Sequence, residues 1–97
     1  MIIKWNKLAV EQLMEAILYL EKNDFSDLAK TIETEILTKI KSLPQHPQIY
    51  QPDRMKKSND GTFYAFEIDN YRISYRVIKD EIRILRIRHS SRRPYTR

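Results

Sequence analysis

Residues 71–89 have the sequence YRISYRVI (Tyr71–Ile78), KD (79–80) and EIRILRIRH (Glu81–His89). Both longer runs alternate apolar and polar side chains and are rich in β-branched residues, a pattern typical of strands. Only two residues separate the runs, which is the length of a tight hairpin turn. This segment therefore predicts an antiparallel pair of strands, and the other elements are placed relative to it.

Two further strands are predicted upstream of this hairpin. Thr62–Ile68 is rich in aromatic residues and is followed by the turn residues Asp69-Asn70. It comes directly after Asp60-Gly61, a strong turn signal because glycine adopts positive φ without cost. Ile2–Trp5 predicts a short first strand. The segment Pro44–Gly61 contains three prolines and a polar run, and it predicts a loop.

Two helices are predicted between the first strand and this loop. The first begins after a potential N-cap at Asn6 and ends at Asn23-Asp24; the second begins after Ser26 and ends before Pro44, which cannot continue the ladder. The residues predicted to be buried are Leu8, Leu13, Ile17 and Leu20, with Ala9, Met14 and Ala16 beside them, and then Leu28, Ile32, Ile36 and Ile40, with Leu37 and Leu43. The short connection predicts an antiparallel helical hairpin.

The element order predicts an α+β fold, β-α-α-β-β-β, in a single domain over residues 1–97. A helical hairpin would pack on one face of a small, mainly antiparallel sheet. The 97 residues, of which 41% are hydrophobic, are enough for one modest core.

Basic residues concentrate at the end of the chain. Residues 71–97 carry nine basic and two acidic side chains, whereas residues 1–70 carry nine and eleven, so the whole net charge of +5 comes from the last part. Strand alternation, with no bulge near Ile84-Leu85, predicts an uncovered basic face. Its members are Arg72, Arg76, Arg86 and Arg88, with His89, Arg92 and Arg93 at its edge. Few carboxylates on these strands are available to pair with them, so the face is expected to bind an anionic partner.

Several classes of chemistry have no residues to support them. The chain has no cysteine and two histidines, His46 and His89, so neither a metal site nor any other cofactor is expected. No glycine-rich phosphate loop and no run long enough to cross a membrane is present, and a cytoplasmic location is expected.

A metal-free ribonuclease is one reading of the basic segment. Such an enzyme needs cations for the charge on the phosphorane and groups that transfer protons. Arg72 could supply the charge, and His89 or Tyr95 a proton. No second residue stands out as a general base.

The segments Asn70–Val77, Ile82–His89 and Arg92-Arg93-Pro94 resemble the RelE/ParE superfamily, the toxins of type II toxin–antitoxin systems. Asn59–Glu67 and the two-helix start are also similar to that family, so the resemblance covers nearly the whole chain. It implies the β-α-α-β-β-β order, a plasmid-stabilisation or addiction role, and a small acidic antitoxin that covers the basic face.

The resemblance implies two activities. RelE-like members cleave mRNA on the ribosome, with an arginine where Arg72 stands, whereas ParE-like members inhibit DNA gyrase. The sequence has Phe63 and Ala65 where one RelE-like branch has lysines, Ser90 where an arginine is expected, and Tyr95 at a slightly different spacing from the family's late tyrosine. These departures favour a ParE-like toxin. The alternatives are a RelE-like endoribonuclease and an inactive member that only binds antitoxin.

Overall fold

The predicted hairpin is formed by strands β4 (Tyr71–Ile78) and β5 (Glu81–His89). The computed structural model describes residues 1–89. The elements before the hairpin are β1 (Ile2–Trp5), α1 (Lys7–Lys22), α2 (Ser26–Ser42), β2 (Gln51–Pro52) and β3 (Phe63–Ile68). Three of the predicted site residues, Arg92, Arg93 and Tyr95, lie outside the described residues.

The strands form one five-stranded sheet in the order β1-β5-β4-β3-β2. β1 runs parallel to β5, and the other neighbours are antiparallel. The α+β fold with a helical hairpin on a mainly antiparallel sheet is therefore confirmed. The prediction of loop structure throughout 44–61 is wrong at Gln51–Pro52, which pairs with Ala65 and Tyr64 of β3. Only two residues pair there, one of them a proline, which is tolerated because β2 is an edge strand.

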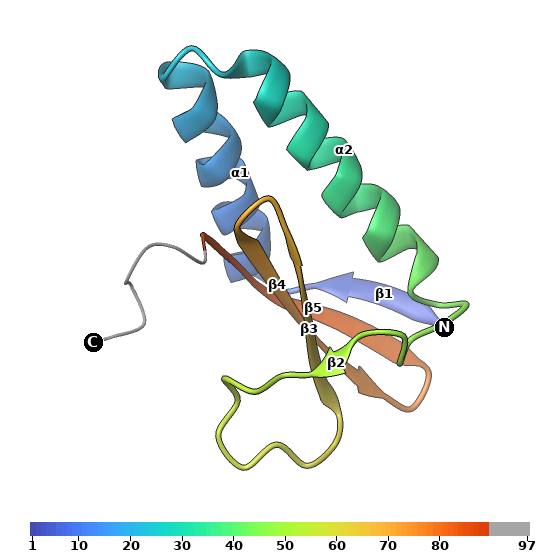
Figure 1. The fold of residues 1–97 in the computed structure, drawn as a ribbon. Helices are drawn as coiled ribbons and strands as arrows, with labels where there is room; N and C mark the ends of the chain where they lie inside the picture. The colour runs from blue at the N-terminus through green and yellow to red at the C-terminus, as the bar shows by residue number, and fades with distance from the viewer. Residues whose placement is uncertain (90–97) are drawn as a thin grey trace.

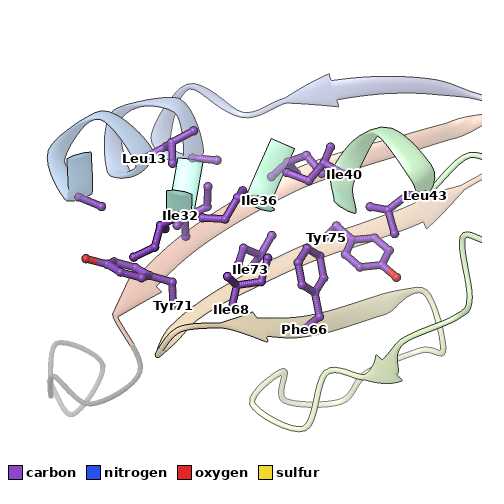
Figure 2. Close-up of a cluster of buried hydrophobic side chains, with 14 of the residues drawn as sticks. Leu13, Ile32, Ile36, Ile40, Leu43, Phe66, Ile68, Tyr71, Ile73 and Tyr75 are labelled. Carbon is purple, nitrogen blue, oxygen red and sulfur yellow. The ribbon is translucent and has the colours of Figure 1, made fainter. Parts of the chain in front are cut away.

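Both helices lie on one side of the sheet, and the segment between β2 and β3 lies on the other side, as Figure 1 shows. The hydrophobic core fills the space between the helices and the strands (Figure 2). Ile36, Ile73 and Tyr75 are fully buried within it. Every buried position of α1 and α2 follows helical spacing, so the amphipathic pattern of the sequence is what fixes which helix face meets the sheet.

Three residues of the predicted core lie at the surface. Leu8, Met14 and Leu28 are each more than 40% exposed, and the buried face of the first helix consists of Ala9, Leu13, Ala16 and Leu20. Each of the three is the chain neighbour of a buried residue, and neighbours on a helix are about 100° apart around its axis, so these side chains point away from the sheet.

The predicted helix caps also differ from the structure. Asn6 occupies the N-cap position of α1 without a capping hydrogen bond, because its Oδ1 accepts one from Arg83 Nη1 at 3.1 Å. Ser26 is the first residue of α2, and Phe25 precedes it in the N-cap position. The predicted cap at Asn6 therefore forms no cap hydrogen bond, and the second helix begins at Ser26 itself.

A β-bulge interrupts the pairing of β4 with β5. Ser74 lies opposite Arg86 and Tyr75 opposite Ile84, so Leu85 is the extra residue. The expectation of uninterrupted alternation is wrong at this point. Because the bulge shifts the alternation by one residue, Ile82, Ile84 and Ile87 are all buried toward the helices.

Candidate functional site: a groove on the helix-free face

The face of the sheet that the helices leave uncovered carries a groove of about 740 Å³. β4 and β5 form its floor, the start of α1 forms one side, and the segment after β2 forms the other. Its lining residues are Asn6, Leu8, Asp53, Met55, Lys56, Lys57, Phe63, Arg72, Ser74, Leu85, Arg86 and Arg88. A volume of this size is within the range of ordinary ligand pockets.

Strand pairing brings the arginines of the floor together. Arg72 lies opposite Arg88, and Ser74 lies opposite Arg86. The bulge at Leu85 is responsible. Because Ile84 is buried toward the helices, uninterrupted alternation would turn Arg86 and Arg88 toward the core as well. Three residues of the predicted basic face therefore line one groove.

The wall of the groove is a folded segment held by Asp53. The amide of Asp53 donates to the Phe63 carbonyl at 2.9 Å, and Asp53 Oδ1 accepts from the Met55 amide at 2.9 Å. Asn59 Nδ2 donates to the Phe63 carbonyl, also at 2.9 Å, and Lys56 N donates to the carbonyl of Asp53. These bonds fix the chain that presents Met55, Lys56 and Lys57 to the groove.

Arg72 is joined to this wall. Its Nη2 donates a hydrogen bond to Oδ1 of Asp53, and both side chains are largely buried. Its Nη1 lies 3.7 Å from Oε2 of Glu67, the residue opposite on β3. Few carboxylates lie on β4 and β5 themselves, but Arg72 finds its partners on a loop and on the preceding strand.

Arg76, the fourth residue of the predicted face, lies beside the groove and is also paired. Its Nε donates to Thr62 Oγ1 at 2.9 Å, its Nη2 lies 3.2 Å from Asp60 Oδ2, and its guanidinium carbon is 4.5 Å from the centre of the Phe63 ring. Hydrogen bonds from the hydroxyl and amide of Thr62, with the Arg76 guanidinium, lower the pKa of the exposed Asp60 carboxyl. Arg76 thus fastens the turn before β3.

Two cations of the groove have no such partners. Arg86 is exposed, and its side chain forms no ion pair or hydrogen bond with any of residues 1–89. The same holds for the exposed Lys57 within that part of the chain. Lys56 Nζ is 4.6 Å from the centre of the Phe63 ring. The charge that the groove offers to a ligand therefore centres on Arg86 and Lys57.

His89 lies on the opposite face of the sheet from Arg72. It pairs with Tyr71, whose ring is buried on the helix side, and the two rings meet edge to face at 4.9 Å. Neighbouring positions on a strand point to opposite faces, so a histidine opposite Tyr71 cannot share a face with Arg72. The catalytic candidates Arg72 and His89 are separated by the sheet, and Tyr95 lies outside the described residues.

The sequence-based reasoning missed several residues of the groove. Met55, Lys56 and Lys57 lie in a segment treated only as a loop, Leu8 was placed in the core, and Phe63 and Leu85 were given no role. The basic pair Lys56-Lys57 beside the Asn59–Gly61 turn was a usable signal. Asp53 had no recognisable signal in the sequence, because its partner Arg72 is nineteen residues away.

Solved structures resemble this fold over nearly its full length. A structure titled "Chromosomal ParDE TA system from P. aeruginosa" matches with a TM-score of 0.72 and 21% identity, covering 92% of this chain and 95% of that one. The isolated E. coli RelE toxin matches with a TM-score of 0.67 and 15% identity, covering 98% and 89%. The YoeB dimer from Staphylococcus aureus matches with a TM-score of 0.58 and 21% identity, covering 91% and 94%.

The fold is therefore that of the RelE/ParE toxins. Residues 3–94 match the family described as the ParE toxin of the type II toxin-antitoxin system, parDE. The chain belongs to this family. No significant match was found among curated proteins. Within residues 1–89, no helix has the length and apolar character that a membrane span requires.

Proposed function

We propose that this chain is a growth-inhibiting toxin that a cognate acidic antitoxin neutralises and that acts in the cytoplasm by binding DNA gyrase, without cleaving mRNA. Membership of the ParE toxin family supports the toxin role and the antitoxin partner. The observation that carries the choice of target is the separation of Arg72 from His89 by the sheet.

Ribonuclease chemistry without a metal needs a cation and proton-transfer groups around one phosphate. Arg72 is engaged by Asp53 and Glu67, so its charge is largely compensated. His89 cannot reach the same phosphate from the other face. A toxin that inhibits its target by binding requires none of these groups to converge, and an accessible surface is sufficient.

The test is induction of the toxin without antitoxin in a bacterial host. The expected result is growth arrest with gyrase-dependent DNA breaks, while mapped mRNA 5′ ends stay unchanged. Purified protein should inhibit supercoiling by gyrase in vitro. Co-expression of a small acidic protein encoded next to the toxin should restore growth.

Variants of His89 and Arg72 test the nuclease alternative. His89→Gln should retain full growth inhibition, because the ring packs on Tyr71 and faces away from the groove. Cleaved mRNA that disappears in Arg72→Ala would contradict the proposal. Normal growth on induction, with binding to the antitoxin intact, would instead favour an inactive member of the family.

One observation, the position of Glu67, supports the nuclease alternative. Glu67 is half exposed, lies opposite Arg72 on the helix-free face, and is a carboxylate in a position to accept a proton. Glu67→Gln is therefore the decisive variant for that alternative. Loss of mRNA cleavage in Glu67→Gln would assign it as the general base, whereas unchanged growth arrest agrees with the proposed gyrase target.

A further inference from the structure

We propose that the groove binds a short segment of the toxin's protein target in which carboxylates alternate with apolar side chains, and that it does not bind a nucleic acid. This inference rests on the proposed function, which gives the chain a protein target. Three observations on the groove support it. Two cations have no partner within residues 1–89, large apolar side chains are exposed, and the one aromatic ring of the lining, among the described residues, is already contacted by cations.

The groove gathers arginines on its floor, where Arg72 lies opposite Arg88 and near Arg86, and lysines on its wall. Arg86 rises from β5 and Lys57 from the wall, and both lack partners within residues 1–89. Arg72, on the floor, is compensated by Asp53. Arg86 and Lys57 can therefore each take a carboxylate, and a guanidinium can bind a carboxylate through two parallel hydrogen bonds.

Apolar side chains lie in the same groove and are exposed or partly exposed there. Met55 is 61% exposed and Leu8 is 44% exposed, although both are large and apolar. Leu85, the bulge residue, adds a third apolar side chain to the floor. Interface cores gain affinity from burying such side chains, whereas the phosphates of a nucleic acid gain nothing from them.

The aromatic residue of the groove is not free to stack on a base. Lys56 Nζ and the Arg76 guanidinium carbon both lie within 4.6 Å of the centre of the Phe63 ring. Proteins that bind single strands combine a positively charged groove along the backbone with open aromatic faces. The ion pair of Arg72 with Asp53 also leaves the floor with less net charge than its arginines alone would give.

Binding of labelled peptides tests the proposal. The probe is a short fluorescein-labelled peptide of Glu-Leu-Ser repeats, compared with a peptide that has serine in place of leucine and with a single-stranded RNA of similar length. The expected result is salt-dependent binding of the first peptide, with weaker binding of the second and of the RNA. Arg86→Gln and Leu85→Ser should each weaken binding of the first peptide about tenfold.

Lys41→Gln is the matched control, because Lys41 is an exposed cation at the end of α2, on the helix side of the sheet. It should bind the peptide like the unmodified protein. Thermal unfolding of each variant must show an intact fold. RNA binding equal to that of the peptide, or Arg86→Gln binding like Lys41→Gln, would overturn the proposal.

Growth inhibition by the same variants links the groove to the target. Arg86→Gln should lose toxicity, whereas Lys41→Gln should keep it. If Arg86→Gln loses peptide binding but causes the usual gyrase-dependent DNA breaks, the groove is not the target surface, although the proposed function stands. Cleaved mRNA without such breaks would reject the proposed function itself.

Discussion

Arg72 and Asp53 form an ion pair that joins the floor of the groove to its wall, with the two side chains 19% and 10% exposed. Arg72 projects from β4 onto the helix-free face, and Asp53 follows the two-residue strand β2. The same Asp53 carboxylate also accepts the Met55 amide. The arginine that the sequence suggests as a catalytic group is thus, in the structure, the anchor of the segment that presents Met55, Lys56 and Lys57.

Asp53→Asn should destabilise the protein by about 3 kcal/mol, because it leaves a largely buried guanidinium with only the more distant Glu67 as a partner. Urea unfolding measures the change. Asp80→Asn, at the exposed β4–β5 turn, is the control and should change stability by less than about 0.5 kcal/mol. Equal losses of unfolding free energy in the two variants would show that the Arg72–Asp53 ion pair does not stabilise the wall segment.

Tyr75→Phe should cost about 1 kcal/mol. The buried hydroxyl donates to the Pro47 carbonyl at 2.9 Å, and removal of the hydroxyl leaves that carbonyl without this partner. Tyr64→Phe is a suitable comparison, because the two tyrosine rings stack at 5.5 Å and no hydrogen bond from the Tyr64 hydroxyl is seen within residues 1–89. A larger loss of stability in Tyr64→Phe than in Tyr75→Phe would contradict a stabilising role for the Tyr75 hydrogen bond.

The same tyrosine predicts the behaviour of the protein in alkali. Burial, with the neighbouring Tyr50 and Tyr64, raises the pKa of Tyr75. A raised folded-state pKa means that its contribution to stability is complete below about pH 10, where the unfolded chain begins to ionise, and declines above it. Unfolding free energy measured across that range should therefore fall less steeply in Tyr75→Phe than in the unmodified protein.

Ile36→Ala should destabilise the protein by about 2–5 kcal/mol, because Ile36 is fully buried between α2 and the sheet and its truncation leaves a cavity. Figure 2 shows this side chain among those of the core. Leu18→Ala on α1 is the control, since Leu18 is 52% exposed. Thermal or urea unfolding measures the stability of both variants. Similar losses in Ile36→Ala and Leu18→Ala would show that Ile36 is not part of the core.

Gly61→Ala should cost about 1 kcal/mol through backbone strain alone. Gly61 has φ of +92°, and a Cβ added there would meet no atom within 4 Å. Gly61→Asn should cost less, because asparagine tolerates positive φ better than alanine. If alanine is accepted without loss in urea unfolding, the turn before β3 does not require this conformation.

Much of the fold follows from local patterns. The alternation of residues 71–89 and the helical spacing of the isoleucines of α2 each fix a secondary structure and a buried face, because side-chain periodicity belongs to the backbone geometry itself. The loop strand β2 was missed because two residues have no periodicity, and they become a strand only by pairing with β3.

The candidate site depended on longer-range relationships. The sequence showed that arginines gather at the end of the chain, but not which of them are already paired. Asp53 compensates Arg72 and Asp60 pairs with Arg76 across loops, and such contacts depend on how the chain folds back on the sheet. The Arg86 side chain has no ion-pair partner among residues 1–89, because the fold places no carboxylate of these residues next to it.

By itself, then, the sequence determined the class of fold and the presence of a basic segment, which are expressed in residue order and periodicity, and it indicated the family through the resemblance of its motifs. Only the tertiary structure decided which face each group occupies. A single bulge at Leu85 shifts the alternation of β5, so that Arg86 and Arg88 face the groove while His89 packs on Tyr71 behind the sheet. The physical reason is that a strand has two faces, and one extra residue exchanges them for every side chain that follows.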